Sequence, residues 1–219
     1  MPEIGFFVER IRPLERALTP TLALALRVVN AKPEPIHSML VRCQVQIEPA
    51  RRGYSPAERE RLLEIFAAPE RWGETLQPLT WQQVTTMVGG FRGTTVAEVL
   101  LPCSLDFTLA STKYFEALDP GAPPAHIPLR LLFSGTVFYQ SPSDSVQAAP
   151  LGWDLEASYR MPAGLWRECM EAYYPGCVWL QLPRRSWESL RRFRTERGLT
   201  SWEAALEALL EQRARKEAA

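Results

Sequence analysis

Residues 39–48, MLVRCQVQIE, alternate between apolar and polar side chains along almost their whole length. A period of two places the apolar side chains on one face of an extended chain, so this stretch predicts a β-strand. The polar face opposite is typical of an antiparallel sheet with one side on the core and the other in water. The expected core face consists of Met39, Val41, Cys43, Val45 and Ile47.

Strand patterns recur on both sides of this stretch. Residues 21–29, TLALALRVV, also alternate, and the turn-forming segment NAKPEP at 30–35 separates them from the first strand. Two alternating runs joined by such a turn predict a β-hairpin. Residues 129–139, LRLLFSGTVFY, are apolar on both faces, which predicts a central strand in which Gly135 marks a bulge or a close backbone approach. Further strands are expected at 81–88, at 95–110 with a kink at Pro102, and at 155–159, the last as a short edge strand.

One helix is expected inside the strand-rich part. Ser55, Pro56 and Glu58 have the spacing of a capping box with proline in the first turn, which predicts a helix over residues 55–68. The segments 69–80 and 140–150 are predicted to be loops.

After residue 162 the apolar spacing changes to that of helices. Helices are predicted at 163–173, at 186–197, where Gly198 provides a left-handed stop, and from 200 onward, where Thr200 and Glu203 form a second capping box. A short apolar run, 178–182, lies between the first two.

These elements predict an α+β protein that is mainly β. The many alternating strands favour an antiparallel β-sandwich or curved sheet with one inserted helix, because a parallel sheet would need regularly alternating helices and residues 81–139 show none. We expect a β domain over 1–160 and a helical C-terminal region over 161–219 that packs on it.

The composition excludes several classes of protein. The 219 residues contain 25 Lys and Arg and 25 Asp and Glu, so the chain lacks the basic excess of most nucleic-acid binders. No stretch has the length and hydropathy of a membrane span, and the N-terminus lacks the pattern of a signal peptide. Four widely spaced cysteines without a Cys-x-x-Cys pair fit a reducing cytoplasm, which is the predicted location.

Residues that could carry catalysis are scattered. Cysteine catalysis needs a nearby base, and the histidines, His37 and His126, both lie in Pro-rich connectors. Zinc ligands usually occur in closely spaced pairs, which this chain lacks. The sequence therefore predicts no catalytic residue, metal or cofactor, and leaves open whether the histidines converge with any of Cys43, Cys103, Cys169 and Cys177. The acids Asp106, Asp119, Asp154 and Glu156 are interpreted as surface residues, and a site assembled around Cys103, Asp106 and His126 is the enzymatic alternative.

The helical region carries the candidate binding residues. Its segment 184–197 contains six arginines, and the region is rich in tryptophan. Tryptophan and arginine are enriched at interaction hot spots, so Trp179, Trp187, Arg191 and Arg194 are the candidate contacts for a protein partner. The alternatives are arginine enrichment from genomic base composition, and a helix-turn-helix for nucleic acid. The acidic helix that follows, with Glu203, Glu207 and Glu211, makes nucleic-acid binding the weaker interpretation.

Three stretches together resemble an uncharacterised bacterial family of unknown function: LLFSGTVFY at 131–139, YPGCVWL at 174–180 and GLTSWEAALEALL at 198–210. The resemblance implies an accessory or assembly role linked to the gene neighbourhoods of nickel–iron hydrogenases, and it assigns no site residues. The N-terminal half is also loosely similar to SecB-type export chaperones, from which the helix at 55–68 and the long tail depart. The sequence-based hypothesis is thus a non-enzymatic, protein-binding accessory protein of undetermined oligomeric state.

Overall fold

The structure is a computed structural model that describes residues 2–104, 106, 109–141, 145–177 and 181–217. It contains two compact units, residues 1–178 and 179–219. The first unit holds all the strands that the structure describes and is mainly β, and these strands pair in antiparallel fashion. The predicted fold class, α+β and mainly β, is confirmed.

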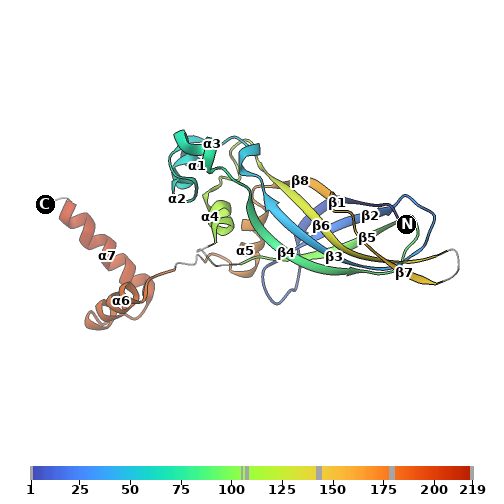
Figure 1. The fold of residues 1–219 in the computed structure, drawn as a ribbon. Helices are drawn as coiled ribbons and strands as arrows, with labels where there is room; N and C mark the ends of the chain where they lie inside the picture. The colour runs from blue at the N-terminus through green and yellow to red at the C-terminus, as the bar shows by residue number, and fades with distance from the viewer. Residues whose placement is uncertain (1, 105, 107–108, 142–144, 178–180, 218–219) are drawn as a thin grey trace. The chain divides into compact units, whose positions relative to one another are not determined.

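Two antiparallel sheets make up the β part of the first unit (Figure 1). The first has the strand order β1-β2-β5, with β1 at Ile4–Pro13, β2 at Thr21–Asn30 and β5 at Thr94–Pro102. The second has the order β4-β3-β6, and both β7 and β8 pair with the long strand β6. Its strands are β3 at Ile36–Ile47, β4 at Leu79–Val88, β6 at His126–Gln140, β7 at Val146–Pro150 and β8 at Glu156–Pro162.

The core lies between the apolar faces that the alternation predicted. All five inward residues of β3 are fully buried, as are Leu22, Leu24, Leu26 and Val28 of β2. Phe6 of β1 stacks on Phe133 of β6 with ring centroids 4.2 Å apart, which joins one sheet to the other. Each such side chain contributes about 1.5–3 kcal/mol when it leaves water, so these two faces supply much of the stability of the unit.

The predicted hairpin between residues 21–29 and 39–48 is wrong. Strand β2 pairs with β1 and β5, whereas β3 pairs with β4 and β6, so the connection at 31–35 crosses from one sheet to the other. Asn30 holds this crossing: its side-chain oxygen accepts from the amides of Glu3 and Lys32, both at 3.1 Å, and its amide nitrogen donates to the carbonyl of Glu34 at 2.9 Å. The two alternating runs are opposed across the core because each needs another apolar face to cover it.

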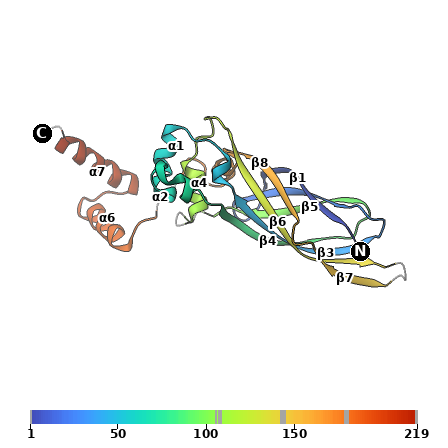
Figure 2. The same ribbon diagram turned by 45° about the horizontal axis from the view of Figure 1, so that its top comes forward.

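Short helices gather at one end of the strands (Figure 2). The predicted capping box is present, but the helix is split into α1, Pro56–Arg61, and α2, Leu63–Phe66. The region 69–80, predicted as a loop, contains a 3₁₀ turn at Pro69–Arg71, helix α3 at Trp72–Thr75 and the start of β4. A further 3₁₀ turn, Pro49–Arg51, follows β3.

Two further expectations for the first unit are also wrong. Helix α4, Ala110–Ala117, lies within residues 81–139, where we expected no helix. Its Tyr114 and Phe115 are buried, so tertiary packing outweighs its weak helix propensity. Part of the strand expected at 104–110 falls outside the described residues. The segment 140–150, predicted as a loop, contains β7, which extends the edge of the sheet.

Helix α5, Leu165–Tyr173, follows the strands and belongs to the first unit. Trp166 stacks on Phe115 of α4 with centroids 5.5 Å apart, and the hydroxyl of Tyr173 donates to the carbonyl of Ala17 at 3.0 Å. The second unit consists of α6, Arg184–Glu196, and α7, Trp202–Glu217. Gly198 has a φ of +63°, as its predicted role requires, but the side chain that caps α7 is Ser201, not Thr200: its Oγ accepts from the amide of Ala204 at 3.1 Å. That these two helices pack on the β unit remains a prediction.

Gly135 is a position where the fold requires glycine. Its φ is +144°, and a Cβ atom there would lie 2.0 Å from the carbonyl oxygen of Leu40 on β3. The expected close approach of two strands is therefore confirmed, with Gly135 paired to Val41 inside the β3–β6 ladder.

We expect Gly135→Ala to lower the free energy of unfolding by more than about 3 kcal/mol, because the central strands must separate to admit the methyl group. Urea denaturation measures this change. Gly89→Ala is the matched control, since a Cβ atom at Gly89 meets nothing within 4 Å. Equal stability of the two variants would contradict the role of Gly135.

Candidate functional site

The structure brings two of the four cysteines together. The backbone amide of Cys103, just after β5, donates to the carbonyl of Pro20 at 2.7 Å, and the thiol of Cys169 on α5 donates to the carbonyl of Thr21 at 3.5 Å. A hydrogen bond between the two sulfurs, together with burial, raises the pKa of Cys103, and the same hydrogen bond lowers the pKa of Cys169. Both side chains are buried, so this pair joins α5 to the first sheet.

The other candidates for cysteine chemistry lie apart. Cys43 is fully buried in the middle of β3, and burial raises the pKa of its thiol to about 12, which keeps it protonated at neutral pH. Cys177 is exposed. His37 lies on β3 at the register shift near the start of the β3–β6 ladder, whereas His126 begins β6 beyond the other end, where Ile47 pairs with Leu129. Roughly ten strand residues at about 3.3 Å each separate the histidines.

His126 lines an open hollow of about 510 Å³ with Arg51, Ser158, Tyr159 and Arg160. The thiol of Cys103 instead contacts Cys169, so these two members of the proposed enzymatic site have different surroundings. Within the described ranges, no group of three or more His, Cys, Asp and Glu side chains is placed to hold a metal ion.

The predicted surface acids have local partners or are exposed. Glu156 accepts from the Nε atom of Arg130 at 2.9 Å, and Asp119 accepts from the amide of Gly121 at 2.9 Å. The amide of Asp106 donates to Ser104 at 3.0 Å, and Asp154 is exposed.

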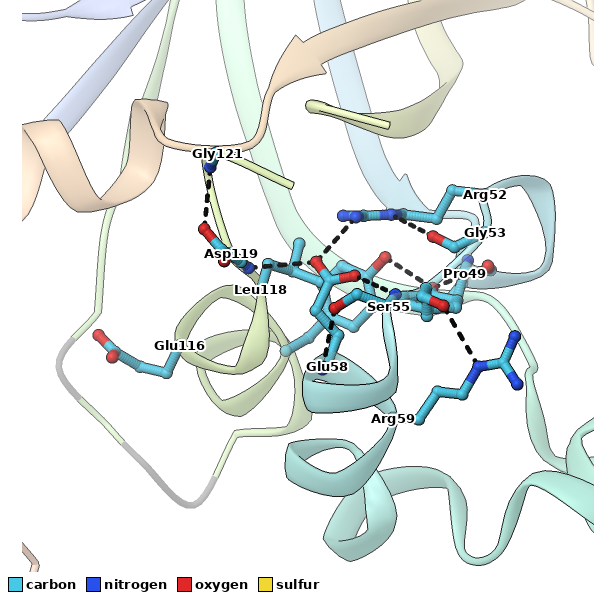
Figure 3. A network of polar contacts seen from close by, with 12 residues as sticks. Pro49, Arg52, Gly53, Ser55, Glu58, Arg59, Glu116, Leu118, Asp119 and Gly121 are labelled. Carbon is cyan, nitrogen blue, oxygen red and sulfur yellow. Dashed lines mark hydrogen bonds and ion pairs between the residues drawn. The ribbon is translucent and has the colours of Figure 1, made fainter. Parts of the chain in front are cut away.

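A buried ion pair that the sequence did not reveal stabilises the helical end of the first unit (Figure 3). Arg52 and Glu58 have fully buried side chains and are joined by a 2.9 Å hydrogen bond. Glu58 also accepts from the amides of Ser55 at 2.8 Å and Asp119 at 3.1 Å, so one carboxylate connects α1 to the segment after α4. The capping pattern predicted only the bond to Ser55, because the partners from Arg52 and Asp119 are set by tertiary structure.

Two tyrosines adjoin this ion pair. The hydroxyls of Tyr54 and Tyr114 are 2.8 Å apart, and Tyr54 donates to the carbonyl of Pro49 at 2.8 Å. Burial raises the pKa of both hydroxyls, so neither serves as a base at neutral pH. The chemistry of this cluster is that of a structural network that holds the short helices at the end of the sheets.

The second unit brings together the predicted binding residues that can be located. The rings of Trp187 on α6 and Trp202 on α7 have centroids 4.4 Å apart, and the guanidinium of Arg194 lies 3.9 Å from the centroid of Trp202. Arg191 is exposed on the same helix, beside a hollow formed by α6 residues alone. Trp179 lies outside the described residues. Trp187 and Arg194 therefore hold the two helices together as a hairpin. Trp202 contacts both of them but was not among the predicted binding residues.

A groove runs along one face of this hairpin. It has a volume of about 760 Å³ and is lined mainly by apolar side chains. Leu206 is 46% exposed and Leu209 is 37% exposed, whereas Ala205 is the residue of the described part of α7 that is fully buried. Two helices alone cannot cover each other's apolar residues completely, so this face is left uncovered within the second unit. The lining residues are Leu182, Arg185, Ser186, Ser189, Leu190, Phe193, Leu206 and Leu209.

Fold and site together define a mainly β, antiparallel α+β protein with a separate helical hairpin. Residues 1–218 match the family described as "Family of unknown function (DUF6084)", and the chain belongs to that family. A comparison with curated proteins finds no match.

Comparison with solved structures finds weak similarities. The CARDB domain of a Pyrococcus furiosus protein, described in complex with di-metal ions, is 7% identical, with a TM-score of 0.28 over 74% of this chain and 92% of that one. The putative ApaA protein from Bordetella pertussis is 12% identical, with a TM-score of 0.28 over 74% of this chain and 95% of that one. TM-scores this low support no inference about function.

We expect Glu58→Gln to lower the free energy of unfolding by about 3–5 kcal/mol, because it leaves the buried charge of Arg52 without its counterion. Glu60→Gln, on the exposed side of the same helix, is the control and should change stability by less than about 0.5 kcal/mol. Denaturant titration of both variants measures the difference. A Glu58→Gln protein as stable as the control would show that the ion pair contributes nothing.

The thiol of Cys43 predicts a dependence of stability on pH. Its pKa is raised from 9.0 to about 12 in the folded protein, so above pH 9 the unfolded chain binds fewer protons and stability falls until about pH 12. Relative to Cys43→Val, which lacks this group, the wild type should lose about 1.4 kcal/mol between pH 7 and pH 10. Chemical denaturation at both pH values tests this, and parallel pH profiles would contradict it.

Proposed function

We propose that this protein is a non-catalytic binding or assembly protein that engages a protein partner through the apolar face of the α6–α7 hairpin. The observation that carries the proposal is the open groove of this second unit, in which leucines line a surface that the two helices leave uncovered. Proteins that act as monomers seldom expose an extended apolar surface, and an apolar surface rimmed by polar residues often marks a site of protein interaction.

The composition of the hairpin supports the same proposal. Trp187 is 40% exposed and packs on Trp202, and the guanidinium of Arg194 lies over the ring of Trp202. Buried or half-buried tryptophans with arginine neighbours are the residues that dominate binding energy at protein interfaces. In this proposal Trp187 and Arg194 shape the hairpin, while Arg191 remains available to a partner.

Several alternatives are less well supported. An enzyme built on Cys103, Asp106 and His126 would need the Cys103 thiol, which is buried against Cys169, to reach a base. Nucleic-acid binding through the arginines of α6 would place the acidic helix α7 beside phosphates. A SecB-like chaperone activity would need an extended apolar surface for unfolded chains.

The proposal extends to the biological setting that the sequence suggested. We place the protein in the cytoplasm, with an accessory role linked to nickel–iron hydrogenases, on the basis of the family resemblance and of four widely spaced cysteines that form no disulfide. Within the described residues, no helix combines the length and apolar character that a membrane span requires.

The test compares two leucines of equal exposure in the full-length chain. Leu206 lines the groove and is 46% exposed, whereas Leu63 on α2 is 45% exposed and belongs to the first unit. Affinity purification from the native host should recover a stoichiometric partner with the wild type and with Leu63→Asp, and lose it with Leu206→Asp, because a charge cannot be buried in an apolar interface without a large cost. Recovery of the same proteins by all three would refute the proposed site.

A further inference from the structure

The two helices of the hairpin differ in charge. Helix α6 carries five arginines and two glutamates over Arg184–Glu196, whereas the first three turns of α7 carry Glu203, Glu207 and Glu211 before any basic residue. The hairpin therefore combines a basic helix, an acidic helix and one shared apolar face.

Helical geometry places these charges on opposite rims of the groove. At about 100° per residue, Arg185 and Arg192 lie on the side of α6 that faces away from α7, next to the lining residue Ser189. Glu203 and Glu207 lie on the side of α7 that faces away from α6, next to Leu206. One long edge of the apolar face is thus mainly basic, with Glu196 as its exception, and the other is acidic.

We propose that the partner of this face is a second copy of the same chain, so that two hairpins form a four-helix bundle; this inference rests on the proposed function and names its occupant. A twofold axis parallel to the helices places α6 of each copy over α7 of the other. The basic rim of one copy then meets the acidic rim of its partner at both edges, except that Glu196 lies opposite Glu203 near the turn. Such an interface is isologous and closed, as in most homodimers, and four helices around one core form a stable bundle.

The register along the helices agrees with this arrangement. Arg192 lies six residues before Gly198 and Glu207 nine after it, which places them about four residues before the end of α6 and five after the start of α7. A twofold axis parallel to the helices keeps the distance from the turn unchanged, so Arg192 of each copy faces Glu207 of the other. The apolar residues that the pairing covers are Leu182, Leu190, Phe193, Leu206 and Leu209.

Charge reversal tests the pairing in the full-length protein. Arg192→Glu and Glu207→Arg should each weaken the dimer by about tenfold, because each places two like-charge contacts at the interface. An equimolar mixture of the two variants should dimerise as the wild type does, since every reversed rim then meets a reversed partner. Light scattering coupled to gel filtration over a range of concentrations measures all three.

Two controls separate charge pairing from misfolding. Arg184→Glu reverses a charge on the side of α6 away from the groove, at a side chain that is 89% exposed, so it should leave dimerisation unchanged. Leu206→Asp should abolish the dimer while circular dichroism remains that of the wild type, and Leu63→Asp should leave it intact.

Each outcome bears on the inference. A wild type that is monomeric at about 100 µM, or a mixture of reversed variants that fails to recover the dimer, would overturn it. A monomer that still recovers a different stoichiometric partner, lost with Leu206→Asp, would overturn the homodimer but leave the proposed function standing. A monomer without any partner would remove both, and would favour a hairpin whose apolar face is covered by its own β unit.

Discussion

The structure depends on the mutual burial of two apolar sheet faces. Strand β3 presents Met39, Val41 and Val45 to the core, and β2 presents its leucines from the opposing sheet. Because each face is too apolar to remain in water, the chain must cross from one sheet to the other between them, and Asn30 stabilises that crossing. The close approach of β6 at Gly135 allows β3 to sit in the centre of its sheet with a neighbour on both sides.

The ends of the sheets are closed by polar and aromatic contacts rather than by more strands. Glu58 combines three interactions in one buried carboxylate, so the short helices after β3 are attached both to their own N-terminus and to the segment after α4. The thiols of Cys103 and Cys169 form a comparable link between β5 and α5. Both links join segments more than 60 residues apart in the sequence. The carboxylate and the thiols, which could in principle take part in catalysis, therefore serve here to hold distant segments together.

The α6–α7 hairpin differs from the first unit, because its two helices leave an apolar face uncovered. Among the residues described in this unit, α6 and α7 are joined by no third element, and a groove of about 760 Å³ remains open between them. The stack of Trp187, Trp202 and Arg194 gives the pair a defined geometry without covering the leucines. The first unit thus buries its apolar faces between two sheets, whereas the second leaves an apolar face that its own helices do not cover.

The sequence alone determined the strongest local patterns, such as the extended, inward-facing alternation of β2 and β3, because periodicity and capping are local properties of the chain. It correctly predicted the alternation at 39–48, the capping box at Ser55 and the left-handed Gly198. It also identified Trp187 and Arg194 as notable, since residue type is visible without coordinates. Only the tertiary structure decided that β2 and β3 lie in different sheets, that Glu58 meets Arg52, that Cys103 meets Cys169, and that α4 is a helix. A periodic pattern shows that a face must be buried, but the surface that buries it comes from distant residues, and no local signal specifies that choice.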